Sequence, residues 1–336
     1  MYRQGNILYG YFSKPMQDDD IHHFTIRELI DDWNREVNFI HNSETTWKYN
    51  ENLQRHILGF FPSDILIESI GTKEITEYLA YLKREKQFSN NTINKHRTHL
   101  LTLFEYATRN DDRYGIVVNP VRKIRPLRHE PYAYKIYSPE EAKLMMRILH
   151  RTGKIELEAA VALALYCGCR REEVCGLRWE NVNFDRKEIT ITEIRTMAGR
   201  EVVHHMYTKN NTIRVVGIPD ALYKILLEVK AYQEQQRLRY DKAKPYEYVL
   251  SEDNGVPWHP SNVTMRWKSF LERHKLRVIR FHDLRHTNLS LLMTQMSAID
   301  VAKIGGHAKV STTTNIYGHS FTDTVERGKK VINKLL

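Results

Sequence analysis

The apolar positions between residues 25 and 118 follow a helical repeat and predict a compact bundle of four helices. The first helix is expected to start at Thr25, because Glu28 three positions later gives the spacing of a capping box. Its apolar residues then recur at i, i+3, i+4 and i+7 (Ile26, Leu29, Ile30, Trp33 and Val37). Similar patterns predict further helices at about 45–57, 73–85 and, after Ser89, 90–107.

Residues 119–136 interrupt this pattern and are expected to link two domains. Pro120, Pro126 and Pro131 favour an extended, semi-rigid chain. Basic residues between these prolines suit contacts with phosphate groups (Arg122, Lys123, Arg125 and Arg128). At the other end of the bundle, residues 1–24 contain one short apolar run, and we interpret them as an appendage that becomes ordered on a partner.

Residues 137–321 predict a second, mainly helical domain with a small antiparallel β-sheet. Ser138 and Pro139 have the residue types of a helix start, and a buried helix at 156–167 is expected to stop at Gly168. The apolar spacing then changes to a period of two, which predicts a three-stranded meander at 188–194, 201–208 and 213–218, with turns at 197–200 and 209–212. Helices are expected again at 220–240, 261–274, 285–296 and 298–304, and in the C-terminal tail at 323–335.

Composition and charge narrow the function. The 336 residues are 41% apolar and 27% charged, with only 15 Gly and 10 Pro, which excludes a disordered or collagen-like protein. Lys and Arg outnumber Asp and Glu by 51 to 41, and this net charge of +10 fits either a polyanionic partner or a solvated basic surface. The longest apolar run, 159–169, is too short to cross a membrane and no signal peptide is visible, so we expect a cytoplasmic protein.

Several short elements of the second domain together suit chemistry on a phosphodiester. They are, in order, Arg170 with Glu173, Lys209, His282 with Arg285, and His307 followed by Tyr317. Guanidinium groups can bind both non-bridging oxygens and stabilise the charge of the transition state. A tyrosine hydroxyl is a weak nucleophile at its ordinary pKa near 10, but neighbouring positive charge and a histidine base can activate it. With no glycine-rich nucleotide loop in the sequence, these residues predict a covalent phosphotyrosine intermediate, which keeps the energy of the broken bond.

No metal or cofactor is expected. Cys167, Cys169 and Cys175 lie on either side of Arg170, but a structural zinc site needs four well-spaced ligands. We therefore interpret the three cysteines as buried thiols beside a helix junction. They are also too few to form a disulfide framework.

Taken in this order, the elements resemble the signature of the tyrosine recombinases, the phage and transposon integrases of lambda type. Residues 168–179 resemble the first arginine box of that family, and residues 281–287 resemble its second box. Residues 25–126 are similar to its helical core-binding domain, including the Asn-Pro-Val step at 119–121. The resemblance covers about residues 25–320.

The resemblance implies a role for each reactive residue. Arg170 and Arg285 would clamp the scissile phosphate, and Tyr317 would attack it. Lys209 would protonate the leaving oxygen, and His282 would help to activate the nucleophile.

Two further roles and two departures complete the comparison. His307 would hydrogen-bond the scissile phosphate, and Glu173 would hold the arginines in position without contacting the phosphate. Cys169 stands where leucine or methionine is usual, and Gly305 stands where leucine is usual. Neither departure removes a reactive group, but Gly305 is expected to loosen the segment that carries His307.

The resemblance also implies a C-shaped clamp around double-stranded DNA and a tetramer on that DNA. Groove contacts are expected from the start of the fourth helix, for which a solvated helix face is an equal alternative (Asn90, Asn91, Asn94, Lys95 and Arg97). The apolar tail 322–336 is expected to dock on a neighbouring copy, with packing on its own chain as the alternative. An accessory factor that bends DNA or sets direction is a possible further partner.

The favoured function is therefore the integrase of a mobile element or prophage. A Xer-like resolvase of chromosome or plasmid dimers has the same chemistry and is the first alternative. A DNA-binding regulator without catalysis and an enzyme of the type IB topoisomerase kind are two others. The complete set of reactive side chains disfavours the regulator.

Overall fold

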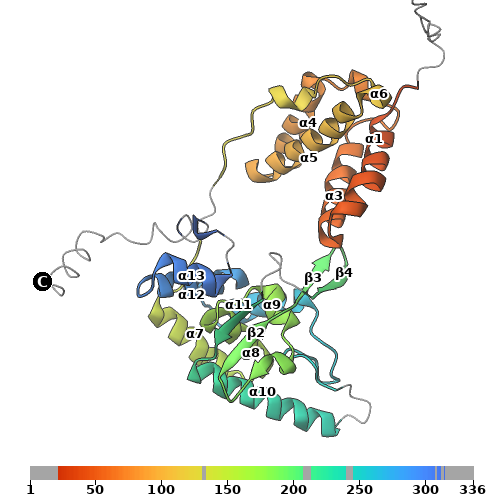
Figure 1. The fold of residues 1–336 in the computed structure, drawn as a ribbon. Coiled ribbons are helices and arrows are strands. Elements are labelled where there is room, and N and C mark those ends of the chain that lie inside the picture. Colours follow the sequence, from red (N-terminus) through yellow and green to blue (C-terminus); the bar gives the residue numbers. More distant parts are fainter. Residues whose placement is uncertain are drawn as a thin grey trace, which may run out of the picture. The chain divides into compact units, whose positions relative to one another are not determined.

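The computed structural model describes residues 22–130, 134–206, 213–239, 245–306, 309–311 and 314. The chain divides into two compact units, Met1–Pro131 and Tyr132–Leu336 (Figure 1). The division falls inside the segment predicted as a linker. The predicted appendage, apart from its last residues, and the predicted tail helix lie outside the described residues.

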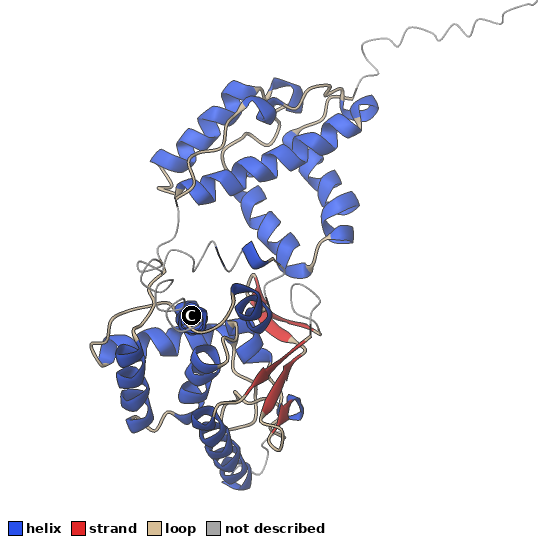
Figure 2. Cartoon of the chain, turned by 60° about the vertical axis from the view of Figure 1, so that its left-hand side comes forward, coloured by secondary structure: helices blue, strands red, loops and turns tan. Residues whose placement is uncertain are grey.

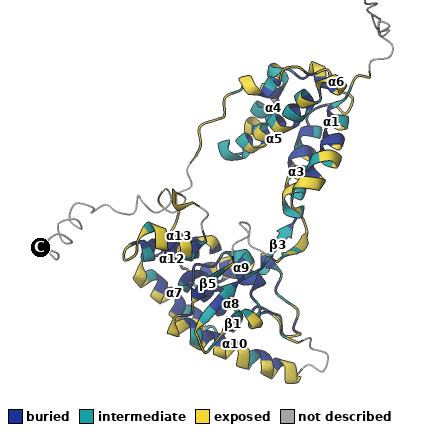
Figure 3. Cartoon of the chain, in the orientation of Figure 1, coloured by how far each residue is buried: buried dark blue, intermediate teal, exposed yellow. Residues whose placement is uncertain are grey.

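The first unit is a helical bundle, as its apolar pattern predicts. Its α-helices are α1 (Ile26–Trp33), α2 (Phe39–His41), α3 (Glu44–Leu58), α4 (Thr72–Arg84), α5 (Asn90–Arg109) and α6 (Asp111–Tyr114). Thr25 caps α1 in a capping box with Glu28, as expected. The predicted first helix changes to a π-helical turn at Asn34–Asn38, so Val37 does not continue a regular α-helix. Apolar residues of α1, α3, α4 and α5 form the buried core (Figure 3).

The beginning of the predicted linker is attached to α5 of the first unit. After a short 3₁₀ turn at Pro120–Lys123, the chain runs along α5 without helix or strand structure up to residue 130. Asn91 and Asn94 each hold this segment by a donated and an accepted bond, to the backbone of Glu130 and Leu127 respectively. Paired bonds of this kind fix an extended strand much as a neighbouring strand would. Residues 124–130 are therefore part of the first unit.

The second unit is mainly helical with small antiparallel sheets (Figure 2), which confirms the predicted fold class. Its helices are α7 (Pro139–Arg151), α8 (Ile155–Tyr166), α9 (Arg171–Gly176), α10 (Asp220–Arg239), α11 (Pro260–Arg273), α12 (Phe281–Met293) and α13 (Ala298–Gly305). The apolar helix α8 is almost entirely buried, and α7, α9, α10, α11 and α12 pack around it. Helix α10 covers it with one face and turns the other to solvent (Figure 3).

The predicted three-stranded meander is wrong in its pairing. The strands are β1 (Val182–Asn183), β2 (Glu188–Ile191), β3 (Ile194–Ala198), β4 (Glu201–His205) and β5 (Arg214–Gly217). Strands β3 and β4 form a separate hairpin, whereas β5 returns to pair with β2, which also pairs with β1.

The strand predicted at 188–194 breaks at Glu193. This buried carboxylate accepts hydrogen bonds from Arg178 at 2.6 Å and His204 at 2.8 Å. Placing Glu193 between these two side chains ends β2 after Ile191 and starts β3 in a new sheet. A charged residue at an inward-facing position is stabilised by its partners, because it cannot remain buried alone.

Predicted helix ends agree with the structure to within a few residues. The largest difference is α12, which starts at Phe281 and not at Arg285, because Asp283 forms a capping box at Arg280. None of the helices in the described part of the chain is both long and apolar enough to cross a lipid bilayer.

Candidate active site

Arg170 lies at a helix junction, where the sequence places it. Gly168, with φ of +63°, turns the chain after α8, and Arg170 is the N-cap of α9. A Cβ on Gly168 would lie 2.7 Å from the side-chain oxygen of Asn288, so glycine is required there for space as well as for φ. The predicted pairing with Glu173 is present: Nη1 of Arg170 donates to Oε1 of Glu173 at 2.8 Å.

Arg285 approaches the same junction from α12. Its side chain is fully buried, and its two terminal nitrogens donate to the carbonyl oxygens of Gly168 and Gly305. The structure therefore brings Arg170 and Arg285 to one place, although they are distant in the sequence.

A third arginine, which the sequence analysis did not single out, completes the cluster. Arg214 begins β5, and its guanidinium donates to both oxygens of Glu173, at 2.7 and 2.6 Å. Its side chain is 9% exposed. One signal could have identified it: Arg214 shares a face of the predicted strand with the buried Val216. We call Arg170, Arg214 and Arg285 the arginine cluster.

The arginine cluster converges on the C-terminal end of α13. The carbonyl of Ile304 accepts from Arg214 at 3.1 Å, that of Gly305 from Arg285, and that of Gly306 from Arg170 at 3.0 Å. The last carbonyls of a helix lack partners within the helix and carry partial negative charge, so cations stabilise them. The prediction that Gly305 loosens the segment that carries His307 stays a prediction, because His307 lies outside the described residues.

Glu173 is the negative charge at the centre of the cluster. Burial alone would raise the pKa of this carboxyl group, but hydrogen bonds and positive charge from Arg214, followed by the charges of Arg170 and Arg285, lower it to about 2. Glu173 is therefore ionised at neutral pH. It also accepts a hydrogen bond from the backbone N–H of Arg170 at 2.7 Å, so it fixes both ends of that residue.

His282 lies in the first turn of α12 and is exposed, whereas Arg285 one turn later is buried. Desolvation by surrounding protein and the nearby charge of Arg285 lower the pKa of His282. Its ring lies edge-on to that of His286, with 4.9 Å between centroids, and His286 in turn contacts Tyr134 at 4.1 Å. A histidine that is neutral at pH 7 is able to accept a proton.

Three predicted reactive residues, Lys209, His307 and Tyr317, lie outside the described residues. His307 directly follows the residues that the arginine cluster binds. The three cysteines are free and buried. Among the described residues, no group of three or more His, Cys, Asp or Glu side chains is arranged to bind a metal ion.

The candidate DNA-binding residues of the first unit have structural partners. Besides Asn91 and Asn94, Asn90 donates to the carbonyl of Arg128 and Arg97 to that of Ile124. Lys95 lies over the ring of Tyr49, 5.8 Å from its centroid. Contacts of these residues with DNA stay a prediction.

The basic linker residues are mostly exposed. Arg122 forms two hydrogen bonds to Glu105, while Lys123, Arg125 and Arg128 present their side chains to solvent. These three positions have the exposure that contacts with phosphate groups require.

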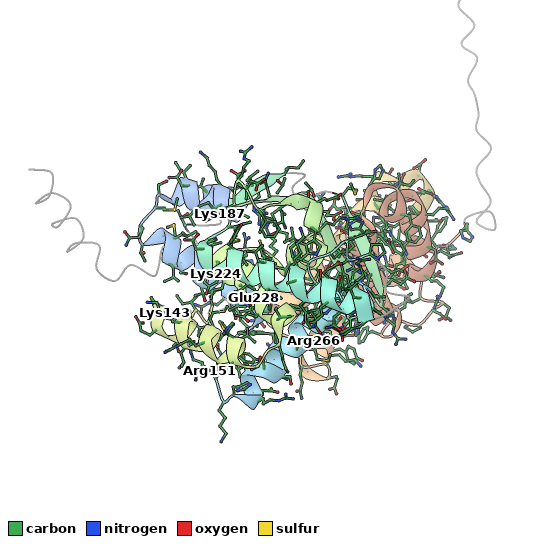
Figure 4. The ribbon with its side chains drawn as sticks, turned by 90° about the horizontal axis from the view of Figure 1, so that it is seen from below. Lys143, Arg151, Lys187, Lys224, Glu228 and Arg266 are labelled. Carbon is green, nitrogen blue, oxygen red and sulfur yellow. The ribbon has the colours of Figure 1, made fainter. Side chains whose placement is uncertain are left out.

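Part of the positive charge lies elsewhere on the second unit. Viewed from below, Lys143 and Arg151 on α7 and Lys224 on α10 point away from the body of the unit (Figure 4). All three are exposed. The net charge of the chain therefore includes solvated cations as well as the buried arginine cluster.

Comparison with known proteins decides the family. The profile described as "Phage integrase family" matches residues 135–323, more than half of the chain, and "Phage integrase SAM-like domain" matches residues 25–114. The chain belongs to the phage integrase family. It is a tyrosine recombinase, as the order of its reactive residues predicts.

Curated relatives span most of the chain. A XerC-like tyrosine recombinase of Caldanaerobacter subterraneus subsp. tengcongensis is 26% identical over 339 residues, which cover 94% of this chain and 84% of the relative. The ICEBs1 integrase of Bacillus subtilis is 27% identical over 286 residues, which cover 84% of this chain and 75% of the relative.

Solved structures share the fold. The Tn1549 transposon integrase in complex with a circular intermediate DNA has a TM-score of 0.75 at 19% identity, covering 91% of this chain and 99% of that chain. A lambda integrase dimer bound to a COC′ core site has a TM-score of 0.68 at 16% identity, covering 88% and 95%.

Proposed function

We propose that this recombinase is the integrase of a mobile genetic element and that it joins DNA ends through a bond to Tyr317. Arg170 and Arg285 bind the non-bridging oxygens of the scissile phosphate. His282 helps to remove the proton of the Tyr317 hydroxyl, and Lys209 protonates the leaving 5′-oxygen. His307 donates a hydrogen bond to the same phosphate.

One observation carries this proposal: Arg170 and Arg285, from different helices, both donate to the C-terminal carbonyls of α13. The next residue in the chain is His307, and Tyr317 follows ten positions later. Both phosphate-binding arginines are therefore bonded to the end of α13, which directly precedes the segment that contains His307 and Tyr317 in the sequence. Positioned cations stabilise the charge that develops on a phosphate during displacement.

The proposed reaction conserves the number of phosphoester bonds. The Tyr317 oxygen forms a bond to phosphorus, the P–O5′ bond breaks, and the 5′-oxygen takes a proton from Lys209. A 5′-hydroxyl from a second duplex then attacks the 3′-phosphotyrosine, and the tyrosine leaves with the proton returned to it. Since each step exchanges one ester for another, the chain's own side chains are sufficient for the proposed chemistry.

The relatives support an integrase and leave a second candidate. The ICEBs1 integrase and the Tn1549 transposon integrase carry the activity in their names. The XerC-like relative supports a Xer-like resolvase of chromosome or plasmid dimers as the alternative. Both candidates use the same residues and differ in the DNA sites that they join.

We further propose the partners that this activity requires. The two units both bind double-stranded DNA, with Lys123, Arg125 and Arg128 along its backbone. Four copies assemble on DNA, supported by the lambda integrase tetramer bound to a Holliday junction among the similar structures. The tail 322–336 docks on a neighbouring copy, and an accessory DNA-bending or directionality factor assists. A protein with this activity acts on DNA in the cytoplasm.

The test uses a nicked suicide substrate that contains the junction sequence flanking the element that encodes the chain. The wild type is expected to form a covalent adduct that survives denaturing electrophoresis, and Tyr317→Phe is expected to form none. Two intact sites in one reaction then distinguish exchange from simple nicking and resealing.

Each outcome assigns a different function. Strand exchange between the two ends of the element supports the integrase. Exchange only at a chromosomal dimer-resolution site assigns the Xer-like alternative, and an adduct without exchange assigns a topoisomerase-like enzyme. Binding without an adduct at any of these sites contradicts the proposal and indicates a non-catalytic regulator.

Deletion of residues 323–336 tests the tail. The truncated chain is expected to bind a single site but to lose assembly and cleavage of paired sites. Unchanged assembly and cleavage would contradict docking on a neighbour.

A further inference from the structure

Arg214 connects α9 to the end of α13, as Arg170 also does, but it is the more deeply buried of the two. Its two terminal nitrogens bind the two oxygens of Glu173 on α9, and its Nε donates to the carbonyl of Ile304 on α13. Arginine can make these contacts at the same time because its guanidinium group is planar and carries N–H donors on two edges.

Arg214 is held at the edge of a sheet. It is the first residue of β5, where it lies opposite Ile191 in β2. The side chain is 9% exposed, and a Cβ on Gly306 would lie 3.0 Å from its Nη1. Gly306 has φ of +63°, so the close approach of the guanidinium and the left-handed turn require glycine at the same position. Arg214 therefore packs closely against the residue that ends α13.

Glu173 binds Arg170 through both of its oxygens, Oε1 from Nη1 and Oε2 from the backbone N–H, and Arg214 adds a second partner to each oxygen. Without Arg214 the carboxylate would have fewer bonds to fix the plane that it presents to the Arg170 guanidinium. With both oxygens held by Arg214, the carboxylate plane is fixed, and Oε1 is presented to Nη1 of Arg170. The second terminal nitrogen of Arg170 binds the carbonyl of Gly306, two residues beyond the Ile304 carbonyl that Arg214 holds.

We propose that Arg214 is a positioning residue of the recombination reaction: through Glu173 and through the end of α13 it sets the orientation of the Arg170 guanidinium. Arg214 itself does not contact the reacting phosphate in this proposal. The proposal rests on the function given to Arg170 in the previous subsection, but its structural part is independent of that function.

The first test compares cleavage with DNA affinity in the full-length protein. Arg214→Ala is expected to slow formation of the Tyr317 adduct on the suicide substrate by about 100-fold, since small displacements of a catalytic group have effects of this size. DNA affinity should stay within about threefold of the wild type. Arg214→Lys keeps the charge but cannot form the bidentate contact with Glu173. It should therefore recover only part of the rate of adduct formation that Arg214→Ala loses.

Arg178→Ala is the matched control. Arg178 also donates to a buried glutamate, Glu193, at 2.6 Å, in the same unit. The other polar partners of this pair in the described part of the chain are Glu247 and His204, which do not belong to the arginine cluster. This variant should cleave at close to the wild-type rate. Equal losses in Arg178→Ala and Arg214→Ala would show that general destabilisation is responsible and would overturn the proposal. Cleavage by Arg214→Ala at the wild-type rate would overturn it as well.

A second measurement does not depend on recombination. The ¹⁵N–¹H signal of the Arg170 side chain, assigned by its loss in Arg170→Lys, reports the orientation of that guanidinium in the protein without DNA. The signal should shift or broaden in Arg214→Ala and stay in place in Arg178→Ala. An unchanged signal in Arg214→Ala would overturn the positioning role even if the wild type proved unable to cleave DNA. A wild type that forms no adduct, together with a shifted signal, would contradict the proposed function and leave the positioning role supported.

Discussion

The guanidinium of Arg285 donates a hydrogen bond to the carbonyl oxygen of Gly305, and a Cβ on Gly305 would lie 3.2 Å from the same nitrogen of Arg285. It would also lie 3.3 Å from the side chain of Leu289. Both neighbours are almost completely buried. Glycine at this position therefore allows the end of α13 to approach Arg285 closely.

Gly305→Ala should lower stability. Alanine is the better helix former by about 1 kcal/mol, but the added methyl group must displace two buried side chains. Overpacking of this kind costs about 1–3 kcal/mol, so we expect a net loss of about 1 kcal/mol in thermal or urea unfolding. Gly217→Ala is the control, because a Cβ there meets no atom within 4 Å. A higher melting temperature for Gly305→Ala would contradict this interpretation.

Arg170→Ala and Arg285→Ala should differ in stability. Removal of the fully buried Arg285 leaves the carbonyls of Gly168 and Gly305 without partners and should cost about 3 kcal/mol. Arg170 is 28% exposed, and Glu173 keeps Arg214 when Arg170 is removed, so a loss of about 1 kcal/mol is expected.

Both variants should lose at least about 100-fold in adduct formation, with DNA affinity within about tenfold of the wild type. Urea unfolding and single-turnover cleavage measure the two effects separately. Equal losses of stability in Arg170→Ala and Arg285→Ala would contradict the larger contribution expected from the buried Arg285. Near-normal cleavage by either variant would contradict the phosphate clamp.

Asn94→Ala should release the linker from α5. The variant loses the two hydrogen bonds with Leu127, which together contribute about 1–2 kcal/mol to holding this segment. Limited trypsin digestion should therefore cut faster after the exposed Arg128. Lys95→Ala, on the adjacent position of α5, is the control and should be cut at the wild-type rate.

The same variant distinguishes two roles of Asn94. If the Asn94 amide holds the linker, Asn94→Ala should lower the affinity equally for related DNA sequences. A loss confined to one base pair of the site would show direct base recognition instead.

Acid should destabilise the first unit through its buried histidines. Burial, and then the charge of a neighbouring histidine, lower the pKa of both His96 and His99 to about 4. The unfolded chain binds these protons near pH 6.5, so stability is complete above that pH and is lost as the pH falls toward 4. At pH 5 the loss should be about 2 kcal/mol for each histidine.

Nuclear magnetic resonance of the imidazole C–H groups checks this prediction. The signals of His96 and His99 should keep the positions of neutral rings down to about pH 4.5. Titration of His96 or His99 above pH 6 would contradict it.

Local residue patterns were sufficient to predict the helices and the principal arginines. Thr25 and Ser138 cap the helices that they were expected to cap, because a cap depends on residues three positions apart. Arg170 with Glu173 was predictable for the same reason. The family motif identified Arg285.

The remaining features depend on partners that are distant in the sequence. The break at Glu193 follows from Arg178 and His204, and the importance of Arg214 follows from Glu173, 41 residues earlier. Position 94 is an asparagine whether its amide binds DNA or the chain's own linker, so the residue type alone does not distinguish the two roles. Spacing alone cannot reveal such partners, so these features appear only in the folded chain.

The three buried cysteines have a practical consequence for experiments on assembly. Burial raises the pKa of Cys169 and Cys175 to about 12 and that of Cys167 well above its ordinary value, so the thiols stay protonated and shielded. The sequence contains no other cysteine. A single cysteine introduced on an exposed helix position, such as Lys143 or Lys224, should therefore accept a maleimide dye selectively in the native protein. Fluorescence transfer between differently labelled copies would then test the proposed assembly of protomers on DNA in real time, without first removing the native thiols.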